Sequence, residues 1–387
     1  MSSSPPVTAI AAPGTAPARG TVPSAPRAPR NVAPSFNVPA ARKWPLLPEV
    51  ALLALGLLAF WAFPSDLGLL TNIAATCIFA LSLNLVLGQA GIASMGHAAL
   101  YGSGAYAAGL FAMHVSSNPL LGLLIGGLAG TAIALASGAA LLRAKGLTLV
   151  MLSIATAQIL LELANWARGV TGGDDGLTGF SVAPLFGHFE FDFIGRTGYL
   201  YTLGVLVVAF LVLRKIADSP FGLTARALRM DAGRVEALGG RVYRHLLAVY
   251  AIGGFMAGLA GAVTAQTTKV ASLSMLDFQL SAGVLIMVVL GGTSRLTGAI
   301  VGTIAYMVIH HIAADLSPHH WLLVIGVLLI ATMVFLPGGL IQLADLVSER
   351  ARSIVMSSAL NQAAPCQSKR TWCRSQLFTV QLRAASI

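Results

Sequence analysis

Polar side chains that could do chemistry are rare in this chain, and three of them stand together in residues 88–110, GQAGIASMGHAALYGSGAYAAGL. They are Gln89, Ser94 and His97. No combination of Ser, His and Asp in the chain has the context of a hydrolase, so nucleophilic catalysis is not expected. Unpaired polar groups are costly in an apolar environment, and they either bond across helices or line a cavity. The three residues are therefore predicted to make structural hydrogen bonds or to line a path for a solute.

A second polar segment, residues 219–246, has the sequence SPFGLTARALRMDAGRVEALGGRVYRHL and carries five arginines between two long apolar runs. One arginine at the centre of a membrane helix costs about 2.5–3.5 kcal/mol, so five together must stay in water or on a partner. Two interpretations fit this composition. The segment is a docking element for another protein, or it is a loop whose arginines set the topology or touch anionic lipid.

The same segment has the pattern of two short helices. A capping residue and a proline begin it, apolar residues recur at i, i+4 and i+7 on one side, and two arginines occupy the neighbouring face. A break near residues 231–233 is followed by the turn RVEAL and by two glycines suited to a helix end. In that order the residues are Ser219 and Pro220; Phe221, Ala225 and Leu228; Arg226 and Arg229; and Gly239 and Gly240. A folded, charged element of this kind favours docking onto a partner.

Two further groups of polar residues are candidate sites. The segment TGGDDGLTG, residues 171–179, predicts an exposed turn or a polar gate that faces an incoming solute, and it lacks the spacing of a calcium loop. Its candidate residues are Thr171, Gly172, Gly173 and Asp174. Histidines 310, 311, 319 and 320 flank the ends of apolar runs, and interfacial placement explains them without a metal. The pattern G-x-x-x-x-G-K-[ST] is absent, so no ATP site of that kind, no cofactor, no metal and no catalytic residue is predicted for this chain.

Composition places the chain in a membrane. Hydrophobic residues make up 56% and charged residues 10%, and the mean hydropathy is +0.79. Soluble domains carry about 25% charged residues, so this chain is predicted to be an integral, all-α membrane protein. The net charge of +10 does not indicate nucleic-acid binding, because the basic residues fall at the ends of apolar runs rather than on one face.

The chain divides into three parts. Residues 1–45 are rich in Pro, Ala and Ser and are expected to be a disordered basic arm, residues 46–341 form the membrane domain, and residues 342–387 form a tail. Ten runs approach the ~20 residues that cross a bilayer, and the eighth is short enough to be re-entrant or broken. They are 46–63, 68–87, 92–113, 119–142, 147–166, 198–213, 246–266, 278–291, 296–315 and 320–337.

The positions of Lys and Arg predict the orientation of these spans. With the N-terminus inside, most basic residues, including the arginines of 219–246, fall on the cytoplasmic side, whereas Asp174, Asp175, Asp277 and other acids fall outside. Ten spans put both termini in the cytoplasm and make the two sets of five opposite in orientation, as in an inverted repeat. Glu162 is the one acid clearly within a span, so ion-coupled transport has little support.

Several segments together resemble one known family. They are LNLVLGQAGIASMGHAALYGSGAYAAGL, RAKGLTLVMLSIATAQIL, TGGDDGL, SPFGLTARALRMDAGRVEALG, GFMAGLAGAV, LIMVVLGGTSRLTGAIVG and FLPGGL, within about residues 72–341. In these segments the chain is similar to the permease subunits of ATP-binding-cassette importers for branched-chain amino acids, specifically the M-type subunit of the leucine/isoleucine/valine system.

The resemblance implies a permease of the bacterial inner membrane that forms the solute path without an ATPase site of its own. It implies as partners a second similar permease, two cytoplasmic ATPase subunits that hold ATP and magnesium, an extracytoplasmic solute-binding protein and membrane lipid. It also implies that 219–239 is a coupling helix held in a cleft of the ATPase by the Phe221 face and by arginine contacts. The residues matching the family there are Ser219, Pro220, Gly222, Arg226, Ala227, Arg229, Glu236, Ala237 and Gly239.

The alternatives are a permease of the same family for urea or short amides, an ion-coupled secondary transporter and a membrane scaffold that transports nothing.

Overall fold

The computed structural model describes residues 66–184 and 195–316, together with isolated positions between 54 and 61 and at 326–327 and 339–340. The basic arm (1–45) and the tail (342–387) lie outside the described residues, as do most of the predicted first and tenth spans. What is described belongs to one unit, Leu46–Ile387, and is helical apart from one pair of two-residue strands.

Within the described residues, six helices are long and apolar enough to cross a membrane. They are α2 (Leu67–Asn84) with its π-helical extension η1 (Leu85–Gln89), α4 (Pro119–Leu141), α5 (Leu147–Trp166), α7 (Arg196–Asp218), α10 (Val242–Thr268) and α12 (Leu296–Leu316). These bounds agree with six of the predicted spans to within a few residues. The chain is therefore a multi-pass membrane protein.

The third and eighth predicted spans are shorter helices. α3 (His97–His114) begins five residues later than expected, because residues 90–96 form a loop whose end is held by other helices. Two hydrogen bonds hold this end: Met95 N donates to Ser153 Oγ (3.0 Å), and Ala98 N donates to Ser281 Oγ (2.7 Å). α11 (Phe278–Gly291) has 14 residues, and at 1.5 Å per residue it covers about 21 Å of the ~30 Å hydrocarbon core.

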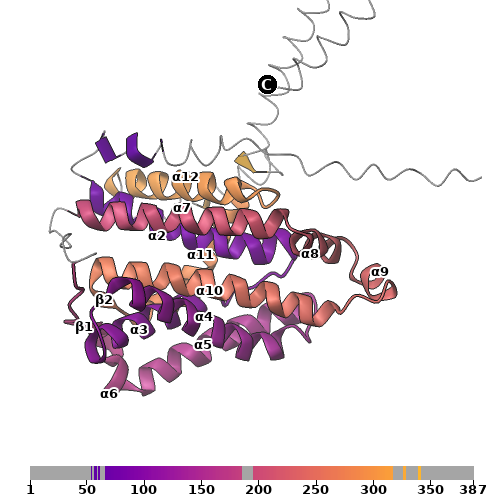
Figure 1. The fold of residues 1–387 in the computed structure, drawn as a ribbon, viewed down its shortest axis with the longest axis horizontal. Coiled ribbons are helices and arrows are strands. Elements are labelled where there is room, and N and C mark those ends of the chain that lie inside the picture. Colours follow the sequence, from indigo (N-terminus) through magenta and orange to yellow (C-terminus); the bar gives the residue numbers. More distant parts are fainter. Residues whose placement is uncertain are drawn as a thin grey trace, which may run out of the picture. The chain divides into compact units, whose positions relative to one another are not determined.

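Helix α10 is the centre of the bundle and packs on α4, α3 and α2 (Figure 1). Its contacts with α3 and α4 depend on glycine: a Cβ added to Gly258 would lie 2.3 Å from Gly126 O, and one added to Gly104 would lie 2.3 Å from Gly258 O. Small residues allow such close approach where lipid supplies no hydrophobic drive between helices. Gly254 packs in the same way, since a Cβ added to it would lie 2.4 Å from Ala134 Cβ on α4.

Short elements complete the fold. They are α6 (Arg168–Thr171), η2 (Gly173–Asp175), β1 (Leu177–Thr178), α8 (Pro220–Met230), α9 (Ala232–Ala237), β2 (Val270–Ala271) and η3 (Leu273–Leu276). β1 and β2 pair antiparallel, with Leu177 opposite Ala271. Figure 1 shows α6, β1 and β2 at one end of the helices and α8 and α9 at the other.

Asp277 lies in the segment between η3 and α11, where its side chain accepts from Gln279 N (3.3 Å) and caps α11. Leu276 is buried in a cluster with Leu177 and Ala271, and a Cβ on Gly102 would lie 2.6 Å from Leu276 Cγ. Gly102 is twelve residues, or about 18 Å, before the His114 end of α3. Leu276, the neighbour of Asp277, therefore packs alongside α3 well before the His114 end.

Candidate functional site

The arginine-rich segment folds as the two predicted helices, and residues 219–239 are called the elbow below. Ser219 Oγ accepts from Gly222 N (3.4 Å), with Pro220 in the first turn of α8, and α8 ends at Met230. Asp231 then caps α9 by accepting from Arg234 N (3.2 Å). Gly239, with φ of +84°, closes α9. The predicted cap, break and glycine end are confirmed, so local sequence alone determines the shape of the elbow.

One face of the elbow packs on the chain itself. Ala225 and Leu228 are buried, and Phe221 is half-buried against the core. The Phe221 ring lies 4.3 Å from the ring of His245 on α10, and its carbonyl accepts from His245 Nε2 (3.0 Å). The face that the sequence assigned to a partner is thus occupied within this chain.

The elbow arginines also contact this chain. Arg226 Nε donates to Gln89 Oε1, and its Nη2 donates to Ala217 O (3.1 Å). Arg229 Nη1 donates to Gly88 O. Two of the side chains expected on the ATPase are therefore bonded to the π-helical end of α2 and to the end of α7.

The opposite face of the elbow is exposed. Leu223 is 57% exposed, and Met230 and Leu238 are each 88% exposed. Ala227, Glu236 and Ala237 are exposed as well. Leu223, Ala227 and Met230 follow one another at i, i+4 and i+7, a second apolar stripe that the sequence analysis missed beside the Phe221 stripe.

Gln89, Ser94 and His97 are all buried, and Gln89 and His97 bond to different parts of the chain. His97 is fully buried, with Nε2 2.9 Å from Ser82 Oγ and its ring stacked at 5.6 Å on Phe79. Gln89 instead meets the elbow through Arg226. Of the two predicted roles, a structural hydrogen bond describes both His97 and Gln89 in this structure.

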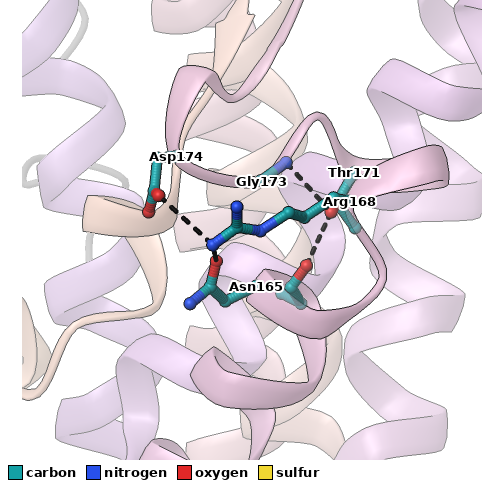
Figure 2. A network of polar contacts seen from close by, with 6 residues as sticks. Asn165, Arg168, Thr171, Gly173 and Asp174 are labelled. Carbon is teal, nitrogen blue, oxygen red and sulfur yellow. Dashed lines mark hydrogen bonds and ion pairs between the residues drawn. The ribbon is translucent and has the colours of Figure 1, made fainter.

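The segment 171–174 forms a tight turn at the other end of the helices (Figure 2). Thr171 Oγ1 donates to Ala164 O (2.6 Å) and accepts from Gly173 N (3.4 Å), and Gly172 joins α6 to η2. Arg168 pairs with Asp174 at 3.6 Å, with both side chains well exposed, so the pair adds little stability. Within the described residues, the candidate groups therefore lie at two opposite ends, with His97 between them.

Comparison with known proteins identifies the family. Residues 67–333 match the family model described as branched-chain amino acid transport system / permease component. The chain belongs to this family. Three proteins named as branched-chain amino acid transport permease LivM resemble it. The Escherichia coli protein is 28% identical over 80% of this chain and 78% of its own length, and the Salmonella typhimurium protein is 27% identical over the same shares. The probable LivM of Methanocaldococcus jannaschii is 24% identical over 68% of this chain and 89% of its own length. No solved structure matches the chain.

The matched region includes every candidate residue of this permease and leaves out the basic arm and the tail. Among the described residues, no three His, Cys, Asp or Glu side chains are grouped so that they could hold a metal ion. The structure thus gives this family member two features to explain: an elbow with an exposed apolar face, and two arginines that fix the elbow to α2.

Proposed function

We propose that this permease is the inner-membrane subunit of an ATP-binding-cassette importer that moves branched-chain amino acids inward. ATP and magnesium are held by two partner ATPase subunits. A second permease completes the path, and a solute-binding protein delivers the solute. The observation that carries the proposal is the elbow, a folded element between spanning helices α7 and α10 with three large apolar side chains in solvent.

The exposed face of the elbow is the proposed contact with the ATPase. Leu223, Met230 and Leu238 are its large exposed apolar side chains, and exposed apolar patches often mark a protein interface. Lipid is an unsuitable cover, since Arg226, Arg229 and Arg234 lie on the same two helices and would be costly to insert. The ATPase thus takes the exposed apolar side chains, while Arg226 and Arg229 hold the elbow to the membrane helices.

The distribution of charge supports a cytoplasmic elbow. Arg143 and Lys145 follow α4, and the elbow follows α7, so basic residues gather where the positive-inside rule puts them. With ten spans, both termini are cytoplasmic and the halves are inverted repeats. The relatives are named as branched-chain amino acid permeases, which favours branched-chain amino acids over urea or short amides.

Helix α5 is the proposed border of the solute path. Gln158 and Glu162, four residues apart on one face, are exposed although the helix has the length and composition of a span. Glu162 is four residues, or about 6 Å, short of the Trp166 end. A carboxylate at this depth is costly in lipid and normally faces protein or water. An amino acid carries an ammonium group that such a carboxylate attracts.

Reconstitution in liposomes tests the function. Uptake of labelled leucine, isoleucine or valine only when ATP, the ATPases and the binding protein are present supports the proposal. Uptake driven by an ion gradient alone would instead identify a secondary transporter, and no uptake under either condition would identify a scaffold. If urea competed with the labelled amino acid for uptake, the substrate would belong to the alternative class of urea and short amides.

A further inference from the structure

Gln89 is buried at the point where the elbow meets the membrane helices. Only 2% of Gln89 is exposed, yet its side-chain oxygen accepts from Arg226 of α8, 137 residues away in sequence. Next to it, Gly88 O accepts from Arg229. A pocket of about 330 Å³ opens beside these residues, lined also by Met230 and Ser294. The contact between α8 and η1 therefore includes hydrogen bonds from two arginines, next to this pocket.

The segment that receives these bonds is shaped for them. The last turn of α2 is π-helical, and such turns are rare and often lie at functional sites. Two residues after its end lies Gly91, whose φ is +73° and where an added Cβ would lie 2.9 Å from Arg229 Cγ. Any other residue at position 91 would strain the backbone and displace the arginine stem.

A short path leads from Gln89 into the membrane domain. Residues 90–96 connect it to α3, and the far end of this loop is bonded to two more helices. Met95 N donates to Ser153 of α5, and Ala98 N donates to Ser281 of α11. Asn84 Nδ2, directly before η1, donates to Arg295 O in the turn between α11 and α12 (3.0 Å). A displacement of η1 would thus act on α3, α5, α11 and α12 together.

We infer that the bonds from Arg226 to Gln89 and from Arg229 to Gly88 form the joint through which movement of the elbow reaches the membrane helices. Gln89 is a positioning residue, which acts through Arg226 and touches neither ATP nor solute. The inference rests on the proposed function, because it assigns the elbow's inner side to transmission and leaves its outer side to the ATPase.

The test uses the complete transporter in liposomes and the variant Gln89→Leu, which keeps similar volume and removes the acceptor. We expect the ATPase subunits to co-purify as with the natural chain and ATP hydrolysis to stay within about twofold, while amino-acid uptake falls by about tenfold or more. Gln89→Glu, which still accepts from Arg226, should restore uptake. Arg234→Ala is the matched control, since Arg234 is exposed on α9 and pairs with Asp231 at 2.7 Å.

Unchanged uptake in Gln89→Leu would overturn the joint, and so would loss of the ATPase subunits or failure of Gln89→Glu to restore uptake. Loss of uptake and hydrolysis together would make Gln89 merely structural and would also overturn it. Failure of the proposed function has a different signature, because the natural complex would then show no ATP-dependent uptake.

Discussion

Substitution of Leu223 is the most direct single-residue test of docking to the ATPase. It is 57% exposed and is the first residue of the apolar stripe on α8. We expect Leu223→Asp to weaken co-purification of the ATPase subunits by at least about tenfold, because a carboxylate would have to be buried in an apolar contact. Arg234→Ala serves as control. Full recovery of the ATPases with Leu223→Asp would place the docking surface elsewhere.

His97 has a structural role at the same scale. Its ring is fully buried between Ser82 and Phe79. Truncation in His97→Ala should leave a cavity and remove the bond between His97 Nε2 and Ser82 Oγ, and should cost about 3 kcal/mol, as for other buried rings. The melting temperature of purified protein reports this loss. His114→Ala, at an exposed position, should change stability by less than about 0.5 kcal/mol. Equal melting temperatures for the two variants would contradict the structural role.

Among the elements, the contact of α10 with α3 and α4 is the most demanding sterically. A Cβ on Gly258 would lie 2.3 Å from a backbone oxygen of α4, whereas one on Gly204 of α7 would meet nothing within 4 Å. We expect Gly258→Leu to abolish the monodisperse fraction in size-exclusion chromatography and Gly204→Leu to keep it. A well-behaved Gly258→Leu protein would show that these helices can separate.

Element shapes were predictable from sequence where their causes are local. The elbow's caps and its break at Asp231 lie within a few residues of the helices they define, so they were predicted and are confirmed. The start of α3 was not, because Ser153 and Ser281, 58 and 183 residues from their partners, hold the loop before it. The bond between Gln89 and Arg226 could not be predicted for the same reason, because the two residues lie 137 residues apart.

Which face of an element is buried was harder to predict. α8 has two apolar stripes, and only the packing of Phe221 on His245 decides that the Phe221 stripe turns inward. In the same way, the packing of Leu276 against Gly102 of α3 could not be predicted, because the two residues lie far apart in the sequence. Helical spacing indicates that a stripe exists, while tertiary contacts decide what covers it.

At the scale of the whole molecule, we propose two functional regions. The elbow receives the movement of the ATPase, and one face of α5 borders the solute path. Glu162→Gln should lower uptake by about tenfold, because the charge that attracts the solute's ammonium is gone, and should leave ATP hydrolysis unchanged. Asp175→Asn, at an exposed acid of η2, should change neither. Natural uptake in Glu162→Gln would remove α5 from the path.

Docking to the ATPase and transmission of its movement both require the elbow to be in the cytoplasm. The accessibility of the elbow to a membrane-impermeant reagent tests this most directly. Arg234→Cys on α9 and Asp174→Cys in η2 are made in a chain with Cys366→Ser and Cys373→Ser, leaving only the buried Cys77. In intact cells, a membrane-impermeant maleimide should label Asp174→Cys alone, and in inside-out vesicles it should label Arg234→Cys alone. The reverse pattern would place the elbow outside, away from any ATPase, and would contradict the proposed coupling.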